Sequence, residues 1–514
     1  MMPSIIHDTH LLQLSEFIAE KLGLYYPRER WDDLKRGFFA ASQELGFDNA
    51  EEGIKWLLSI VPEKVHLQIL ASHLTIGETY FFRDKELLEA LTQHVLPEII
   101  RNQRGREQRL RFWCAGCCSG EEAYTLAILL HQLLPDIQDW KVTITATDIN
   151  LHFLDKATKG IYGEWSFRNA PVWLKKRYFN ASADGHYSIL PEIKKLVTFD
   201  YLNLVEDVYP LLGNNTNAMD LIFCRNVLMY FSPVQAQRVI SNLSKALVED
   251  GWLVVSPSEA SKALFPQFTN VNHPGAILFQ KDRAAAITKP KPTVTKPAAK
   301  FVAPIIEEYV QLELLPHPTS DAFLEQVSSP VKNSLDPSVL SDQLALAQSL
   351  YSQGRYAEVV DMLAATIAEN ASKHSKDLAK NLAVFSLMAR ALANQGRLKE
   401  ALECCSRWIA ADKVNADGYY MRALILMESG DIKQASSSMQ QAIFLRPNFV
   451  LAYFSLGNIA RSSGKMDEAY KYFSIVKRLL NGHQPNEILP ESDSLTVGQL
   501  SKIINAMPLI EGVS

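Results

Sequence analysis

The stretch Leu110–Glu122, LRFWCAGCCSGEE, decides the fold. Its first five residues form an apolar run with the length of a strand, and the following residues, AGCCSGEE, contain two glycines that permit a tight turn. A helical pattern then occupies 121–134, and Ser119 is expected to cap that helix. A buried strand that passes through a glycine turn into a helix is typical of the first unit of a parallel α/β sheet.

Further strands and helices alternate along the same part of the chain. The expected strands are 142–147, 221–224 and 252–256, and the expected helices are 150–158 and 235–248. This alternation predicts a parallel sheet with helices on both faces. Two short strand patterns, 187–190 and 196–199, lie near a turn at Gly185 and predict a small antiparallel insertion.

The length of 514 residues exceeds what one hydrophobic core supports and indicates several domains. Helical spacing begins at Leu11 and Leu14, whereas the stretch after 283 is rich in Pro, Lys, Ala and Thr, as linkers are. The predicted organisation is an all-α N-terminal domain (1–75), an α/β Rossmann-like domain (76–283) with its β insertion at about 160–200, a flexible Pro-rich linker (284–340), helical repeats (341–482), and a tail (483–514) with a closing helix over 496–507.

The repeats are recognised from four glycines in similar contexts. Gly354, Gly396, Gly430 and Gly464 follow one another at intervals of 42, 34 and 34 residues. Five positions after the last three of them stands an alanine, as the close approach of two paired helices requires. A period of 34 residues with this register is the tetratricopeptide (TPR) signature, which predicts an all-α solenoid with a concave groove for a peptide or a partner helix.

Composition excludes several classes of protein. The net charge of -5 argues against a nucleic-acid partner, and no apolar run reaches the roughly 18 residues that a membrane span needs. Six cysteines are too few for a disulfide framework and suit a reducing, cytoplasmic compartment. Cys114, Cys117 and Cys118 have no companion ligands that would complete a metal site, so no metal is expected.

Two further motifs connect the chain with a known family. Residues 73–83 read HLTIGETYFFR, and residues 223–230 read FCRNVLMY, directly after an apolar strand. Together they resemble the CheR-type chemoreceptor methyltransferases, in the subclass that carries TPR repeats. The resemblance covers about residues 10–283. It implies a class I methyltransferase domain that uses S-adenosylmethionine (AdoMet), leaves S-adenosylhomocysteine, and esterifies glutamate side chains of chemoreceptors.

The resemblance also assigns the residues of the site. It implies catalytic roles for Arg83 and Tyr230, and cofactor contacts for Gly77, Thr79, Arg83, Glu122, Asp148, Asn203, Leu204, Arg225 and Asn226. Glu122 is the expected partner of the AdoMet amino group, with Glu121 the weaker choice, and Asp148 is the expected partner of the ribose. Related sequences usually carry Asn where this chain has Gly77, so a backbone N–H would have to replace one side-chain hydrogen bond.

Two other functions fit the same sheet. A nucleotide-dependent oxidoreductase would need a G-x-G-x-x-G fingerprint, which the turn after 110–114 lacks. A TPR scaffold with a non-catalytic AdoMet-binding domain is the alternative to the enzyme. The expected partners are chemoreceptors as substrate and, at the repeats, a protein of the same signalling pathway or the enzyme's own catalytic half. The expected location is cytoplasmic, in association with membrane receptor arrays, without insertion into the membrane.

Overall fold

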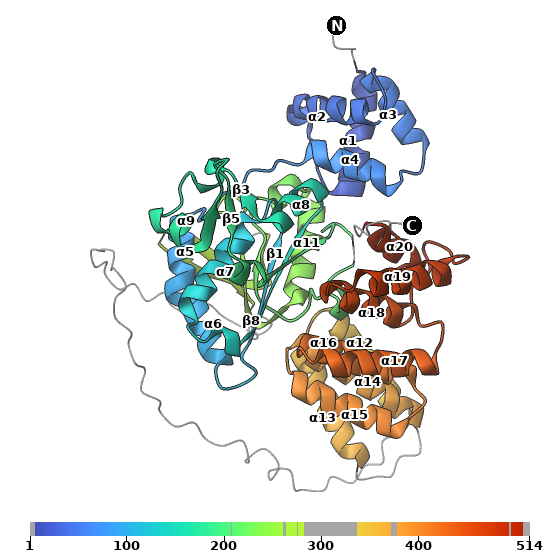
Figure 1. The fold of residues 1–514 in the computed structure, drawn as a ribbon. Coiled ribbons are helices and arrows are strands. Elements are labelled where there is room, and N and C mark those ends of the chain that lie inside the picture. Colours follow the sequence, from blue (N-terminus) through green and yellow to red (C-terminus); the bar gives the residue numbers. More distant parts are fainter. Residues whose placement is uncertain are drawn as a thin grey trace.

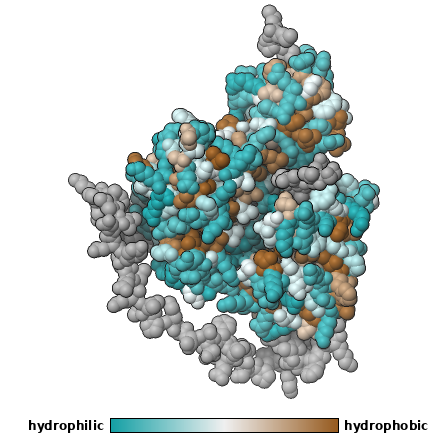
Figure 2. Space-filling model, viewed as in Figure 1, coloured by the Kyte–Doolittle hydropathy of each residue, from teal (hydrophilic) through white to brown (hydrophobic). Residues whose placement is uncertain are grey.

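The computed structural model describes residues 6–281 except 207, 261–263 and 275, and residues 337–371 and 378–506 except 493–494. Figure 1 shows three parts: a helical domain at the top, a sheet-containing domain at the left, and a helical solenoid at the lower right. The predicted linker lies outside the described residues apart from 337–340, which belong to a helix. None of the helices in this part of the chain is long and apolar enough to cross a membrane. Figure 2 shows hydrophobic residues in separate patches on a mainly hydrophilic face.

The N-terminal domain is a bundle of four helices. These are α1 (Asp8–Leu22), α2 (Trp31–Glu44), α3 (Ala50–Ser59) and α4 (Lys64–Leu74), with a short 3-10 turn at Arg28–Arg30. Leu11, Leu14 and Ile18 recur at helical spacing on α1 and are completely buried in the core of the bundle. The helix ends at Gly23, which has φ of 79°, a left-handed conformation that glycine adopts without strain.

A seven-stranded sheet forms the centre of the next domain, in the order β6-β2-β1-β7-β8-β10-β9. Its strands are β1 (Arg109–Ala115), β2 (Lys141–Asp148), β6 (Val197–Tyr201), β7 (Met219–Phe223), β8 (Leu247–Val254), β9 (Phe268–His273) and β10 (Ala276–Lys281). The first five in this list pair in parallel, whereas β10 pairs antiparallel with both β8 and β9. The predicted fold class is confirmed, although the antiparallel edge strands were not expected.

Helices cover both faces of this sheet. They are α5 (Lys85–Ala90), a π-helical turn (Leu91–Val95), α6 (Leu96–Gln103), α7 (Glu121–Leu133), α8 (Leu151–Lys159) and α11 (Pro233–Ala246). Along β1, Leu110, Phe112 and Cys114 pack with α5, α6 and α7, while the alternate residues Trp113 and Ala115 pack on the other side with α11. The strand is buried throughout because successive side chains face two cores.

The insertion after α8 is smaller than predicted. It contains β3 (Ile161–Tyr162), β4 (Phe179–Ala181) and β5 (Tyr187–Ile189), in the order β3-β5-β4, together with a 3-10 turn (Glu164–Phe167) and α9 (Val172–Tyr178). Assigning 196–199 to this insertion was wrong. A short helix, α10 (Pro191–Lys194), turns the chain back, and β6 then joins the main sheet in parallel with β2.

The C-terminal helices form four antiparallel pairs followed by a closing helix. They are α12 (Pro337–Ser352), α13 (Tyr356–Ala371), α14 (Leu378–Asn394), α15 (Leu398–Ala411), α16 (Ala416–Glu428), α17 (Ile432–Leu445), α18 (Val450–Ser462), α19 (Met466–Leu480) and α20 (Val497–Ala506). The four glycines of the repeat all have left-handed φ between 72° and 82° at the turn within a pair. Ala401, Ala435 and Ala469 are completely buried, as close packing of paired helices requires.

The repeats lie against the sheet-containing domain. Leu424, Leu451 and Phe454 belong to the same hydrophobic core as Trp113 and α11. The turn at Gly396 approaches the side chain of Arg109, at the amino end of β1. The second of the two expected partners of the repeats, the catalytic half of the same chain, is therefore in contact with them in the structure.

Candidate functional site

A cavity of about 950 Å³, part of it open to solvent, lies at the carboxyl ends of β1, β2, β6 and β7. Ligands of open α/β sheets bind at this edge. Nine of the ten residues that the sequence nominates line it: Thr79, Arg83, Glu122, Asp148, Asn203, Leu204, Arg225, Asn226 and Tyr230. Gly77 is the one that does not.

The turn after β1 is fastened to the end of β2. The backbone N–H groups of Gly116 and Cys117 both donate to the carbonyl of Thr147, at 2.8 and 2.9 Å. Gly116 has φ of 82°, and a Cβ added there would overlap Val227, so only glycine lets the two loops meet. This close approach brings backbone and not side chain to the cavity wall.

Glu121 and Glu122 point in different directions. Glu121 is buried, and its carboxylate accepts hydrogen bonds from the hydroxyls of Ser119 and Ser166, at 2.8 and 2.9 Å. Glu122 lines the cavity. The prediction that Ser119 caps α7 was wrong, because Gly120 is the cap residue and the hydroxyl of Ser119 is engaged by Glu121.

Asp148 stands at the end of β2 with its carboxylate facing the turn. Its oxygens accept from the N–H of Cys118 at 2.8 Å and from the N–H of Asn150 at 2.9 Å. Burial raises the pKa of Asp148 above its ordinary value, against the lowering effect of these hydrogen bonds. The carboxylate is thus fixed by backbone donors and keeps acceptor capacity for a ligand in the cavity.

An ion cluster around the buried Arg225 lies between the ends of β1 and β7. The Arg225 side chain is 2% exposed and donates to Glu122, at 2.5 Å, and to Asp84. One guanidinium with two carboxylates leaves this corner with a net negative charge. Such a corner suits a ligand with a positively charged end, because an ammonium or sulfonium group is attracted there without displacing the arginine.

The segment that carries Thr79 and Arg83 is held to the domain by two backbone contacts between these residues. The N–H of Phe81 donates to the carbonyl of Ser166 at 2.9 Å, and the N–H of Phe82 donates to the hydroxyl of Thr125 at 3.2 Å. The Arg83 guanidinium donates to the carbonyl of Glu78 at 2.9 Å. Arg83 forms no ion pair with any residue that the structure describes, so its charge is available to a ligand.

The position of Gly77 has a steric explanation. A Cβ added to Gly77 would overlap the ring of Phe153, which itself lines the cavity. The aromatic ring therefore occupies the space that the side chain of an asparagine would need. Phe153 was not nominated from the sequence, where it reads as an ordinary apolar residue of α8.

Residues of the helical domain form one side of the cavity, which was not predicted from the sequence. Leu22, Leu24 and Leu74 line it, and the side-chain amide of Asn203 donates to the carbonyl of Lys21 at 2.8 Å. The N–H of Tyr25 donates to the carbonyl of Tyr230 at 2.7 Å. Burial raises the pKa of Tyr230, so its hydroxyl stays protonated at neutral pH.

Glu259 is a further residue of the site that could not be predicted from the sequence. It is 5% exposed and lies beyond the end of β8. Its carboxylate accepts from the N–H groups of Asn226, Val227 and Met229, at 2.8, 2.7 and 3.2 Å, and from both the N–H and the hydroxyl of Ser256. Asn226 has φ of 56°, a left-handed conformation. Glu259 therefore fixes the loop that presents Arg225 and Asn226 to the cavity.

The fold and this site define a class I AdoMet-dependent methyltransferase. The family model "CheR methyltransferase, SAM binding domain" matches residues 77–277, and the model of the tetratricopeptide repeat matches 344–416 and 420–482. The chain belongs to the chemotaxis protein methyltransferases and carries TPR repeats in addition. AdoMet is its cofactor, and the resemblance seen in the sequence is confirmed.

Three relatives show the extent of the similarity. The chain is 31% identical to chemotaxis protein methyltransferase 2 of Vibrio cholerae, over 50% of this chain and 87% of the relative. It is 34% identical to the chemotaxis protein methyltransferase of Borreliella burgdorferi, over 42% and 75%. It is 33% identical to chemotaxis protein methyltransferase 1 of Pseudomonas aeruginosa, over 45% and 85%.

Replacing Asp148 by asparagine is expected to weaken AdoMet binding. Hydrogen bonds to a charged group are worth about 1.5–3 kcal/mol, so the dissociation constant should rise roughly 10- to 150-fold. Because burial raises the pKa of Asp148, the wild-type carboxylate becomes protonated at a higher pH than an ordinary aspartate. Wild-type affinity should therefore fall on acidification, and the variant should lack this pH dependence. Calorimetry across pH measures both effects.

Asp155→Asn is the matched control for that experiment. Asp155 lies on α8, pairs with Lys159 and is well exposed to solvent. Its removal should leave both the affinity and its pH dependence unchanged. Equal pH profiles for wild type and Asp148→Asn would contradict a role for Asp148 in ligand binding.

Proposed function

We propose that this chain methylates glutamate side chains of chemoreceptors and so forms glutamate methyl esters in a chemosensory pathway. The observation that carries the proposal is the distribution of charge in the cavity. The ion cluster of Glu122, Arg225 and Asp84 is net negative, whereas Arg83, which lines the same cavity, forms no ion pair among the described residues. The first suits the charged end of AdoMet, and the second suits a carboxylate.

The proposed contacts follow from these positions. Asp148 would accept hydrogen bonds from the ribose, Glu122 from the amino group, and Asn203 and Leu204 would border the adenine. Thr79 and Arg83 would lie near the cofactor carboxylate and the methyl group, with Tyr230 beside it. All of these residues line the cavity. Gly77, which the resemblance also assigned to the cofactor, does not line it and is left out of the proposal.

The reaction needs no general base. A glutamate side chain has a pKa of about 4.3 and is already anionic at neutral pH. One carboxylate oxygen attacks the methyl carbon in line, an O–C bond forms while the S–C bond breaks, and S-adenosylhomocysteine leaves as a neutral thioether. No proton is transferred, which agrees with the protonated state of Tyr230. The protein's contribution is orientation and exclusion of water.

The proposal also covers location and the repeats. The enzyme would act in the cytoplasm, at receptor arrays, and its six free thiols suit that compartment. The repeats would bind a protein of the same pathway through surfaces that the catalytic half leaves uncovered. A TPR stack presents both a concave and a convex face, so contact with the catalytic half on one side leaves room for a partner.

Transfer of tritium from methyl-labelled AdoMet to a receptor-containing membrane fraction tests the proposed function. The purified full chain is expected to label the receptors, and the label should be released by mild base, because methyl esters hydrolyse there and N-methyl or S-methyl groups do not. Receptors whose methylation-region glutamates are replaced by alanine serve as the control and should remain unlabelled. Label that survives base would contradict ester formation.

A further inference from the structure

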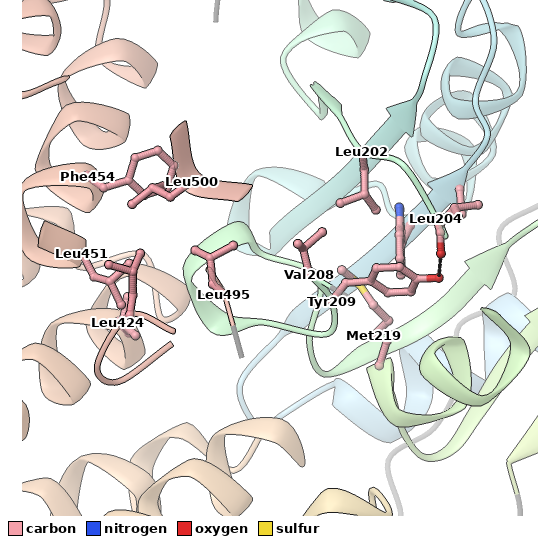
Figure 3. Close-up of a cluster of buried hydrophobic side chains, with 14 of the residues drawn as sticks. Leu202, Leu204, Val208, Tyr209, Met219, Leu424, Leu451, Phe454, Leu495 and Leu500 are labelled. Carbon is pink, nitrogen blue, oxygen red and sulfur yellow. Dashed lines mark hydrogen bonds between the residues drawn. The ribbon is translucent and has the colours of Figure 1, made fainter. Parts of the chain in front are cut away.

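One segment of the chain connects the cofactor cavity with the repeats. Leu202, Asn203 and Leu204 line the cavity. Val208 and Tyr209, a few positions further along the chain, are buried in the hydrophobic core that includes residues of the repeats. Figure 3 shows this course, with Leu202 and Leu204 on one side of Tyr209 and Leu495, Leu451 and Leu424 on the other. We call residues 202–206 and 208–217 the bridging segment.

Tyr209 is the centre of the bridging segment. Its side chain is buried, its hydroxyl donates to the carbonyl of Leu204 at 2.8 Å, and its ring meets that of Trp113 edge to face at 5.3 Å. Tyr209 therefore ties the cavity wall to the core that the repeats share with the sheet. A 3-10 turn, Leu212–Asn214, follows and packs on α16.

Both ends of the bridging segment are held by polar contacts from the repeats. Just before its start, at the end of β6, Asp200 accepts a hydrogen bond from Arg461 of α18 at 3.0 Å. At its end, the amide of Asn217 donates to Glu428 of α16 at 3.1 Å. The repeats thus contact the chain at both ends of the bridging segment: before the residues that line the cavity, and after the 3-10 turn.

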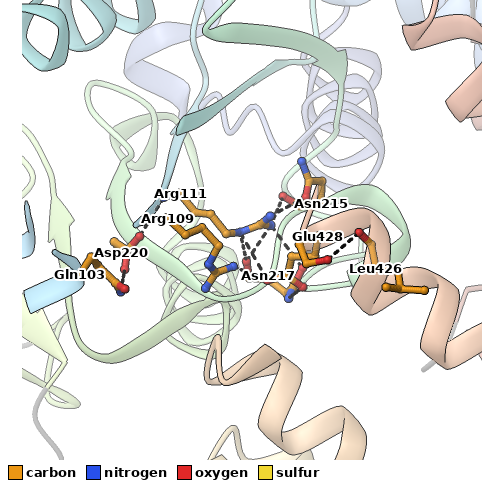
Figure 4. A network of polar contacts seen from close by, with 9 residues as sticks. Gln103, Arg109, Arg111, Asn215, Asn217, Asp220, Leu426 and Glu428 are labelled. Carbon is orange, nitrogen blue, oxygen red and sulfur yellow. Dashed lines mark hydrogen bonds and ion pairs between the residues drawn. The ribbon is translucent and has the colours of Figure 1, made fainter. Parts of the chain in front are cut away.

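Glu428 is the stronger of these two anchors because it is fully removed from water. Its side chain is 4% exposed, and it forms ion pairs with Arg109 and Arg111, each 3% exposed. Arg111 in turn donates to the carbonyls of Asn215 and Asn217, at 3.1 and 3.0 Å, and to the side chain of Asn215 at 2.7 Å (Figure 4). Removing Glu428 would leave two buried guanidinium groups short of a counter-charge and loosen the segment they hold.

We propose that the docked repeats hold the bridging segment in the conformation that forms the cavity wall, and so set the affinity of the enzyme for AdoMet. The proposal rests on the proposed assignment of the cavity as the cofactor site. By thermodynamic reciprocity, a bound cofactor would also strengthen the docking of the repeats. A partner that pulls the repeats away would lower cofactor affinity without touching the site.

The test compares Glu428→Gln with Asp417→Asn in the full chain. Asp417 is the matched control, because it also lies on α16 but forms its bidentate ion pair, at 2.7 and 2.9 Å, with Arg446 within the repeats. Glu428→Gln is expected to raise the KM for AdoMet and the dissociation constant of S-adenosylhomocysteine about five- to tenfold, with kcat at saturating AdoMet within about twofold. Asp417→Asn should change neither.

A milder variant keeps the test decisive if Glu428→Gln unfolds the repeats. Arg461→Ala removes the partly exposed pair with Asp200 and should raise the KM for AdoMet by roughly two- to threefold with kcat unchanged. Unchanged affinity in both variants, or equal shifts in Glu428→Gln and Asp417→Asn, would overturn the proposal. Failure of the wild-type chain to bind S-adenosylhomocysteine would instead overturn the assignment of the cavity, and the proposal with it.

Discussion

Replacing Arg83 by alanine is expected to remove most methyl transfer while the protein stays folded. The guanidinium lines the cavity, is held by the carbonyl of Glu78, and is free of carboxylate partners among the described residues. Loss of a well-placed charged contact costs about 2–5 kcal/mol, so kcat/KM should fall by roughly 30- to 4000-fold. Initial rates at varied AdoMet and varied receptor measure the loss.

The same experiment separates the two possible duties of Arg83. A rise in the KM for AdoMet would assign Arg83 to the cofactor carboxylate, whereas a fall in kcat or a rise in the KM for receptor would assign it to the acceptor glutamate. Arg407→Ala is the control, because that arginine is exposed on α15 and pairs with Glu403. A loss below about threefold, with normal thermal stability, would contradict a site role for Arg83.

Glu259→Gln is expected to cost both stability and cofactor affinity. Each carboxylate oxygen accepts at least two of the five hydrogen bonds. Whichever oxygen the glutamine NH2 group replaces, that NH2 group is itself a donor and would lie against at least two other donors, so these hydrogen bonds are lost. At about 1.5–3 kcal/mol for each hydrogen bond to a charged group, the free energy of unfolding should fall by roughly 3–6 kcal/mol. Denaturant titration of the full chain, with and without S-adenosylhomocysteine, measures the effect.

Ser256→Ala is the matched control for Glu259. It removes one hydroxyl donor and leaves the carboxylate with its four backbone N–H groups, three of them from the loop after β7. The control removes one hydrogen bond to a charged group, so it should lower stability by about 1.5–3 kcal/mol and leave the KM for AdoMet unchanged. Normal stability together with normal AdoMet affinity in Glu259→Gln would show that the loop is held by other contacts.

The parts of the site that were predictable are those that follow from local order along the chain. Glu122 comes directly after a strand and a glycine turn, and Asp148 ends the next strand, so the topology of a parallel sheet places both at one edge. Glu259 escaped prediction because its role depends on where β8 ends relative to the loop after β7. The sequence around a glutamate in a loop does not indicate that five hydrogen-bond donors from two separate loops will meet at its carboxylate.

The docking of the repeats was beyond sequence reasoning for a similar reason. Glu428 ends a repeat helix like many exposed acidic residues, and its partner Arg109 stands 319 positions earlier. Arg109 and Arg111 read as polar interruptions of a strand, although both are buried. The error at 196–199 has another cause. A short β-branched run shows that a strand exists but does not name the strand beside which it lies.

Leu22 and Leu24 of the helical domain line the cavity together with residues of the sheet-containing domain, and this has a consequence for the whole molecule. A ligand enclosed between the helical domain and the sheet contacts both, so the free energy of its binding adds to the association of two parts of the chain. By mass action, a ligand present at 100 times its dissociation constant contributes about 2.7 kcal/mol to the closed form. The concentration of AdoMet in the cell would thereby determine how often the helical domain separates from the sheet-containing domain. At low AdoMet concentration the two domains would be less firmly associated.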